Sequence, residues 1–136
     1  MAVFNKFNAF ADAVMEKVHD FGADTLKVAL SNTAPTASNA VLADITEISY
    51  TYCSPRALTV ASSSQSGGLY KLVVNNLTLT AGGGSVGPFR YLVIYNDSAA
   101  SKQLVGWYDY GSALTLADTE SLTLAFDATN GMLQLQ

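Results

Sequence analysis

The sequence predicts a mainly β fold, an antiparallel β-sandwich of the jelly-roll or immunoglobulin-like kind, with one N-terminal amphipathic α-helix. Three observations support this fold class. After residue 25, apolar and small polar residues alternate with a period of two, which is typical of antiparallel strands with one solvated face. Turn residues separate these segments at short intervals. Charged residues make up only 13% of the chain, against about 25% in a typical soluble domain.

The chain has 136 residues, which is the length of one domain. We divide it into a helix over residues 3–21 and a β-sandwich over residues 25–136, with a long loop over residues 31–55. The net charge of −4 disfavours binding to nucleic acid. No run of about 20 apolar residues is present that would cross a membrane. We therefore expect neither nucleic acid nor a membrane among the partners.

The helix is predicted from the spacing of the large apolar residues. At about 100° per residue, they fall within one arc of roughly 140°, and Gly22 follows as a C-terminal stop. The opposite face, which holds His19, is mostly acidic, unlike that of a membrane-surface helix. We expect His19 to be solvated and the apolar face to be buried against the sheet or a neighbouring subunit. The apolar face consists of Phe4, Phe7, Phe10, Ala11, Val14, Met15, Val18 and Phe21.

The strands follow in order along the rest of the chain. Residues 89–95 are apolar on both faces and predict a central strand, with residues 104–108 as its neighbour. Asn130-Gly131 predicts a type I′ hairpin, because both central positions of that turn need φ > 0. Connections of the length of residues 31–55 are unusual in a compact domain and are often functional. The alternating segments are residues 26–30, 58–60, 77–80, 114–116, 122–126 and 133–136.

The sequence contains no complete motif for catalysis or for metal binding. The chain has one cysteine, Cys53, and one histidine, so neither a disulfide nor a Cys/His zinc site forms within one chain. Gly83-Gly84-Ser85-Val86-Gly87 matches the G-x-S-x-G motif of hydrolases. In hydrolases a helix follows the serine and the histidine comes later, whereas here Pro88 and a strand follow and the histidine comes earlier. We expect no enzyme activity, no cofactor and no metal.

Aromatic residues and flexible loops are the best candidates for an interface. Because the chain has few charges, we expect its interface to be hydrogen-bonded and aromatic rather than ionic. Alternation places Trp107 and Tyr108 on opposite faces of one strand. Exposed tyrosines suit either a protein interface or a sugar platform. The candidate interface residues are Phe4, Phe7, Tyr50, Tyr52, Gly83, Gly84, Ser85, Trp107 and Tyr110.

Several segments together resemble a known family. In order, they are Phe4-Asn5-Lys6-Phe7-Asn8-Ala9-Phe10, residues 24–35, Ser85-Val86-Gly87-Pro88-Phe89-Arg90-Tyr91, Tyr95-Asn96-Asp97, Gly106-Trp107-Tyr108-Asp109-Tyr110-Gly111 and residues 126–131. This order is similar to that of small structural proteins from the head-gene region of tailed bacteriophages, the capsid decoration (cement) proteins. The resemblance spans nearly the whole chain and rests on structural rather than chemical motifs. It departs from the family pattern at residues 48–56.

The resemblance implies a non-enzymatic virion protein on the capsid exterior, assembled in the host cytoplasm. Such a protein binds the major capsid protein, stabilises the shell and is expected to be a homo-oligomer. Two other functions stay open, namely a tail or fibre component and a small carbohydrate-binding module that uses Trp107 or the tyrosines. Copy number per particle separates the first two functions, and glycan binding would favour the third.

Overall fold

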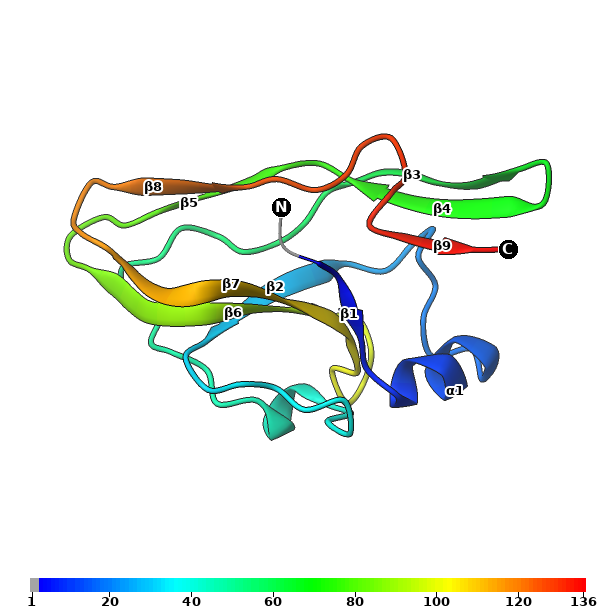
Figure 1. The fold of residues 1–136 in the computed structure, drawn as a ribbon, viewed down its shortest axis with the longest axis horizontal. Helices are drawn as coiled ribbons and strands as arrows, with labels where there is room; N and C mark the ends of the chain where they lie inside the picture. The colour runs from blue at the N-terminus through cyan, green and yellow to red at the C-terminus, as the bar shows by residue number, and fades with distance from the viewer. Residues whose placement is uncertain (1–2) are drawn as a thin grey trace.

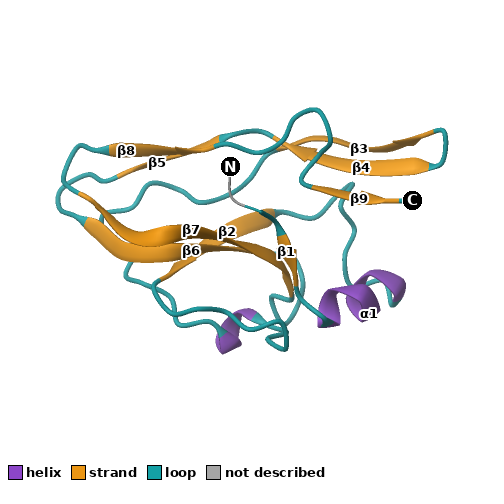
Figure 2. Cartoon of the chain, viewed as in Figure 1, coloured by secondary structure: helices purple, strands orange, loops and turns teal. Residues whose placement is uncertain are grey.

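The computed structural model describes residues 3–136 and confirms a mainly β fold with antiparallel sheets and one short α-helix (Figure 2). The strands are β1 (Asn5–Lys6), β2 (Leu26–Ser31), β3 (Val60–Ser66), β4 (Leu69–Val74), β5 (Leu77–Thr80), β6 (Val86–Asn96), β7 (Leu104–Leu116), β8 (Ser121–Leu124) and β9 (Leu133–Leu135). The helix is α1 (Ala9–Met15), and a short 3₁₀ helix, η1 (Leu42–Asp44), lies in the long loop.

The strands form two layers in a sandwich-like arrangement (Figure 1). One layer is a four-stranded sheet in the order β1-β7-β6-β2. The other layer contains β3-β4-β9 and the pair β5-β8. The predicted central strand is confirmed, since β6 lies between β7 and β2 and pairs with the predicted neighbour.

The main hydrophobic core lies between the layers. Fully burying a large apolar side chain stabilises a fold by about 1.5–3 kcal/mol, so this core dominates the stability. Its fully buried members include Leu26, Val28, Leu30 and Ile94 from the four-stranded sheet, and Leu72, Leu79 and Leu124 from the other layer.

A second, smaller core covers the outer face of the four-stranded sheet. Phe7 and Leu104 are buried in it, and the η1 region packs against it through Leu42 and Ile45. Figure 1 shows η1 on the side of this sheet that faces away from the other layer. The two-sided burial explains why residues 89–95 are apolar on both faces.

The helix predicted over residues 3–21 is wrong in its length, because α1 (Ala9–Met15) has only seven residues. Lys17 adopts a left-handed conformation with φ of 66°. The N–H of the next residue bonds to the Ala13 carbonyl, which is the closing pattern of a Schellman motif. The helix therefore ends well before Gly22, the predicted stop. No helix among residues 3–136 is long and apolar enough to cross a membrane.

The residues before α1 form a strand instead of a helix. β1 pairs with β7 across Asn5 and Trp107. The Phe4 ring packs on Gly106, whereas the Phe7 ring contacts Trp107 at 4.6 Å between centroids. The two phenylalanines thus belong to different cores, and pairing with β7 overrides the helical preference of this segment. The sheet consequently begins before residue 25, the predicted boundary of the sandwich.

The predicted Asn130-Gly131 hairpin is also wrong. β8 and β9 pair with β5 and β4 rather than with each other. The Asp127 carboxylate accepts the Asn130 N–H at 2.9 Å and shapes this turn. The two-residue hairpin with positive φ at both positions joins β3 to β4 at Gly67 and Gly68, where φ is 61° and 85°.

The close approach of β1 to β7 depends on Gly106. A Cβ at this position would meet the Phe4 ring and lie 2.6 Å from the Asn5 carbonyl oxygen. We expect Gly106→Ala to lower the free energy of unfolding by about 1–3 kcal/mol, because β1 must move away. Gly82→Ala is the matched control, since a Cβ there meets no atom within 4 Å. Urea unfolding measures both variants, and equal stabilities would contradict the proposed packing of β1.

Candidate interaction surface

The candidate interface residues divide among separate parts of the fold. Phe4, Phe7 and Trp107 pack at the junction of β1 and β7. Phe7 is fully buried, while Phe4 and Trp107 are half-buried. The predicted opposition of Trp107 and Tyr108 is confirmed, because Trp107 contacts Phe7 in the outer core and Tyr108 contacts Phe4 on the other face. Phe4, Phe7 and Trp107 therefore stabilise the fold rather than form an open interface.

Tyr50 is fixed by three neighbours. Its hydroxyl accepts the Leu30 N–H at 2.9 Å and donates to Glu47 Oε1 at 2.7 Å. The Arg56 guanidinium lies over its ring at 3.5 Å from the centroid. Burial raises the pKa of the Tyr50 phenol, which stays protonated. Tyr50 therefore ties the long loop to β2.

The long loop covers the free edge of β2. Bridges join Ser31 to Glu47 and Lys27 to Ala57. The Ile48 N–H bonds to the Leu30 carbonyl, and the Leu58 N–H bonds to the Leu26 carbonyl. An uncovered sheet edge is a template for pairing with another chain. Most of the loop predicted at residues 31–55 thus protects the sheet.

Tyr52 and the glycine loop come together at one surface. The Tyr52 ring lies on the backbone of Gly83 and Gly84, and a Cβ on Gly84 would lie 2.5 Å from two of its carbons. The Tyr52 carbonyl accepts the Gly82 N–H at 2.9 Å. Tyr52 is 45% exposed, and Ser85 is exposed beside the loop. We call Tyr52, Gly83, Gly84 and Ser85 the Tyr52–glycine surface.

Hydrogen bonds hold the Tyr52–glycine surface in one arrangement. Ser54 and Thr80 exchange two bonds, from the Ser54 N–H to the Thr80 carbonyl and from the Thr80 N–H to the Ser54 hydroxyl. The Gly83 N–H bonds to Asp118 Oδ1 at 2.9 Å. Cys53 lies next to Ser54 in this segment. Burial raises the pKa of the Cys53 thiol, and the Arg56 charge partly opposes this rise, so the protonated thiol is favoured. The surface is ordered before any partner binds, which lowers the entropy cost of binding.

Ser85 and His19 lie at opposite ends of β6. Ser85 directly precedes the strand, and His19 is hydrogen-bonded to Asn96, its last residue. A strand of eleven residues is roughly 30 Å long, whereas a serine nucleophile and its base lie about 3 Å apart. Among residues 3–136, no three His, Cys, Asp or Glu side chains lie close enough to hold a metal ion.

His19 is half-buried, so the predicted solvated position is wrong. Its ring lies 5.4 Å from both the Phe10 and Phe21 rings, measured between centroids. Asn96 Nδ2 donates to His19 Nδ1 at 3.0 Å and to Asp24 Oδ2 at 2.7 Å. Two backbone N–H groups of the next turn fix the Asn96 amide in this orientation. Nδ1 therefore accepts, and the neutral ring carries its proton on Nε2. Burial lowers the pKa of His19, and Asp24 partly opposes this.

A groove of about 840 Å³ runs between α1, the following turn, β4 and β9. Met15 and Leu135 line it with exposed fractions of 82% and 61%. Met15 was expected on the buried face of a longer helix, and that expectation is wrong. The short helix and the left-handed Lys17 leave this groove open. The spacing of apolar residues along the chain contains no signal for it.

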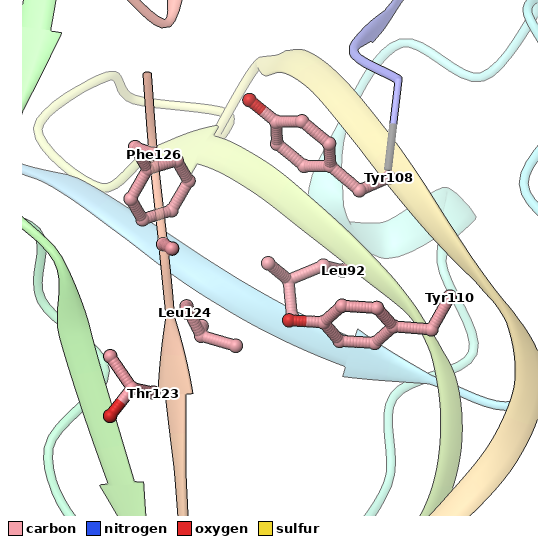
Figure 3. Close-up of a pocket in the computed structure, with 7 residues that line it drawn as sticks. Leu92, Tyr108, Tyr110, Thr123, Leu124 and Phe126 are labelled. Atoms are coloured by element: carbon pink, nitrogen blue, oxygen red, sulfur yellow. The ribbon is translucent and has the colours of Figure 1, made fainter. Parts of the chain in front are cut away.

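Tyr110 lines a pocket of about 190 Å³ on the open side between the layers (Figure 3). The rings of Tyr108 and Tyr110 project from β7 toward Leu92 and Phe126. Burial, followed by the Asp127 carboxylate and then Tyr110, raises the pKa of Tyr108 to about 12. Both tyrosines are half-buried, so their faces do not form an open platform for a sugar ring.

Most cationic side chains are engaged within the chain. Asp97 pairs with Lys27 at 3.4 Å and with Lys102 at 3.1 Å. Arg90 pairs with Asp109 at 2.8 Å, and Lys71 donates to a backbone carbonyl. The charged side chain bonded at the Tyr52–glycine surface is Asp118. That surface therefore offers mainly aromatic and backbone groups to a partner.

Comparisons of this chain with protein-family models, curated proteins and solved structures found no match.

The setting of His19 predicts a loss of stability in mild acid. The unfolded chain binds a proton near the ordinary pKa of about 6.5, whereas the folded chain binds it at lower pH. Consequently, the free energy of unfolding should fall as the pH drops from about 6.5 through the lowered pKa. Chemical denaturation at a series of pH values measures this slope.

His19→Gln removes the titrating group and should flatten the slope between pH 7 and pH 5, about where His titrates. Asp97, Asp109 and Asp127 have lowered pKa values, so their effects appear below about pH 4. An unchanged slope in the variant would show that His19 does not control this dependence.

Proposed function

We propose that this protein is a non-enzymatic structural protein of a tailed-phage virion, a capsid decoration protein that binds the major capsid protein on the shell exterior. The observation that supports this function best is the Tyr52–glycine surface. Two loops that are distant in sequence and were both expected to contact a partner meet there in one ordered, exposed patch. The segment order that resembles decoration proteins supports the family assignment and includes Ser85, whereas residues 48–56, with Tyr52, depart from the family pattern.

The rest of the fold suits a scaffold with an attachment surface. Both faces of the four-stranded sheet are buried, and the long loop seals the edge of β2. The serine and histidine of a conceivable hydrolase site lie at opposite ends of β6. A decoration protein needs such a scaffold, because each copy acts by contacting the shell and many copies act together.

The chemistry of the Tyr52–glycine surface suits a contact of low ionic character. Tyrosine offers a large contact area at a small cost in side-chain entropy. The Gly83 N–H is already bonded to Asp118, so the remaining backbone groups of Gly83 and Gly84 would hydrogen-bond to a shell protein, which needs no complementary charges for this. Because salt screens only ionic attraction, attachment should persist at high ionic strength.

The proposal is tested by the protein content of purified particles from the phage that encodes this chain. Quantitative mass spectrometry should find hundreds of copies per particle in the capsid fraction, which is expected of a cement protein. A few to tens of copies in tail fractions would favour the tail or fibre alternative. Absence from purified particles would overturn the virion assignment altogether.

Tyr52→Ala should weaken attachment while leaving the fold intact. Losing a central interface tyrosine typically costs at least 1–2 kcal/mol, about a 5- to 30-fold loss of affinity. The measurement is saturation of particles that lack the protein, at low and at high salt. Wild-type binding that collapses at moderate salt, or a Tyr52→Ala variant that saturates particles normally, would place the contact elsewhere.

Two control variants separate binding from folding. Tyr50→Phe leaves the Leu30 N–H without its acceptor, so it should lower the free energy of unfolding by about 1–3 kcal/mol and spare attachment. Met15→Ala removes an apolar side chain that is even more exposed than Tyr52, 82% against 45%, from the groove beside α1. It should leave both stability and attachment nearly unchanged.

A further inference from the structure

The outer edges of the sheets differ in their protection against pairing with another chain. The long loop covers β2, and β1 and β9 have only two and three residues. The outer side of β7 carries Asp109 and is interrupted by a register shift between Asp109 and Leu114. Such bulges and charges are the usual protection of an edge strand.

β3 is the longest edge strand without such protection. β5 and β8 also pair with one strand each, but each of them has only four residues. β3 has seven residues, Val60–Ser66, and pairs only with β4 among the strands of residues 3–136. It contains no charged residue and no proline. Its one irregularity is a register shift between Val60 and Ser62, so Ser62 to Ser66 form a regular strand with an open side.

The turn that joins β3 to β4 determines which backbone groups point outward. Gly67 and Gly68 form a two-residue turn, with Ser66 opposite Leu69. In such a hairpin the pair next to the turn is hydrogen-bonded, and hydrogen-bonded and non-hydrogen-bonded pairs alternate from there. The N–H and carbonyl groups of Ser63 and Gln65 therefore point away from β4. They form an evenly spaced set of donors and acceptors on the open side.

We propose that β3 pairs antiparallel with β3 of a second copy of this chain, about a two-fold axis at Ser64. Ser63 of one copy then lies opposite Gln65 of the other, and their backbone groups exchange hydrogen bonds. The two β9-β4-β3 sheets become one continuous sheet across the dimer. This inference goes beyond the proposed function and does not depend on it.

Charge favours a second copy as the occupant. Two copies with a net charge of −4 repel each other, so self-association is least costly where the surface is neutral. Residues 57–70, between Arg56 and Lys71, hold no charged side chain. Serine hydroxyls both donate and accept, so identical serines pair with each other across a two-fold axis. A partner strand with charged residues would find no counter-charge on β3.

Disulfide trapping tests the pairing and its register. Ser64 would face Ser64 of the second copy in a non-hydrogen-bonded pair, with Cα atoms about 4.5 Å apart, within the range that a disulfide spans. Ser64→Cys in a Cys53→Ala background should give a disulfide-linked dimer on a non-reducing gel under mild oxidation. Thr123→Cys in the same background is the matched control, because Thr123 is exposed on the edge strand β8. It should stay monomeric.

Sedimentation equilibrium tests the pairing without a covalent trap. The wild type should exceed the monomer mass of 14.3 kDa, and Ser64→Thr should behave alike. Ser64→Lys places two cations opposite each other and should weaken the dimer about fivefold or more. Circular dichroism checks that the fold is unchanged. Three results would each overturn the proposal, namely a wild type at monomer mass throughout, an unaffected Ser64→Lys, or equal trapping of Ser64→Cys and Thr123→Cys.

Discussion

Burial of the four-stranded sheet on both faces is the constraint on which the rest of the structure depends. One face packs against the second layer. The other face has no further sheet to cover it, so Phe7 and the η1 region of the long loop pack there. The loop then returns along β2 and is fixed by Tyr50. The part of the loop beyond Tyr50 is not used in these contacts, and it forms the exposed surface with the glycine loop.

The strands were predictable because alternation is a local signal that survives in most folds. The helix was not, because a phenylalanine every third residue fits both a long helix and the strand and short helix that form. Which of the two forms depends on the room that Gly106 leaves for the Phe4 ring and on the left-handed conformation of Lys17. The spacing of apolar residues in the sequence indicates neither of these two features. Likewise, Asn130-Gly131 has good local turn chemistry, but β8 and β9 each pair with other strands.

The candidate site was predictable only in part, for the same reason. Tyr50 and Tyr52 have the same local composition, yet Tyr50 is fixed by Leu30, Glu47 and Arg56, and Tyr52 is not. The contact between Tyr52 and Gly84 spans about 30 residues of sequence and is created by the bridge from Cys53 to Ala81. His19 lies between two aromatic rings because α1 ends early. Each of these placements depends on tertiary contacts rather than on neighbours in sequence.

The proposed β3 pairing and the proposed contact at the Tyr52–glycine surface use different parts of the molecule, and this affects how a dimer would bind a shell. The β3–β4 hairpin lies at one end of the molecule, and the loop before β6 that forms the Tyr52–glycine surface lies at the other (Figure 1). Pairing through β3 would therefore leave one Tyr52–glycine surface free at each outer end of a dimer. A dimer with two outward surfaces binds a repeating lattice bivalently, and the second contact forms at the effective concentration set by the first. An interface with few charges and modest affinity per copy would then suffice to hold such a protein on a shell.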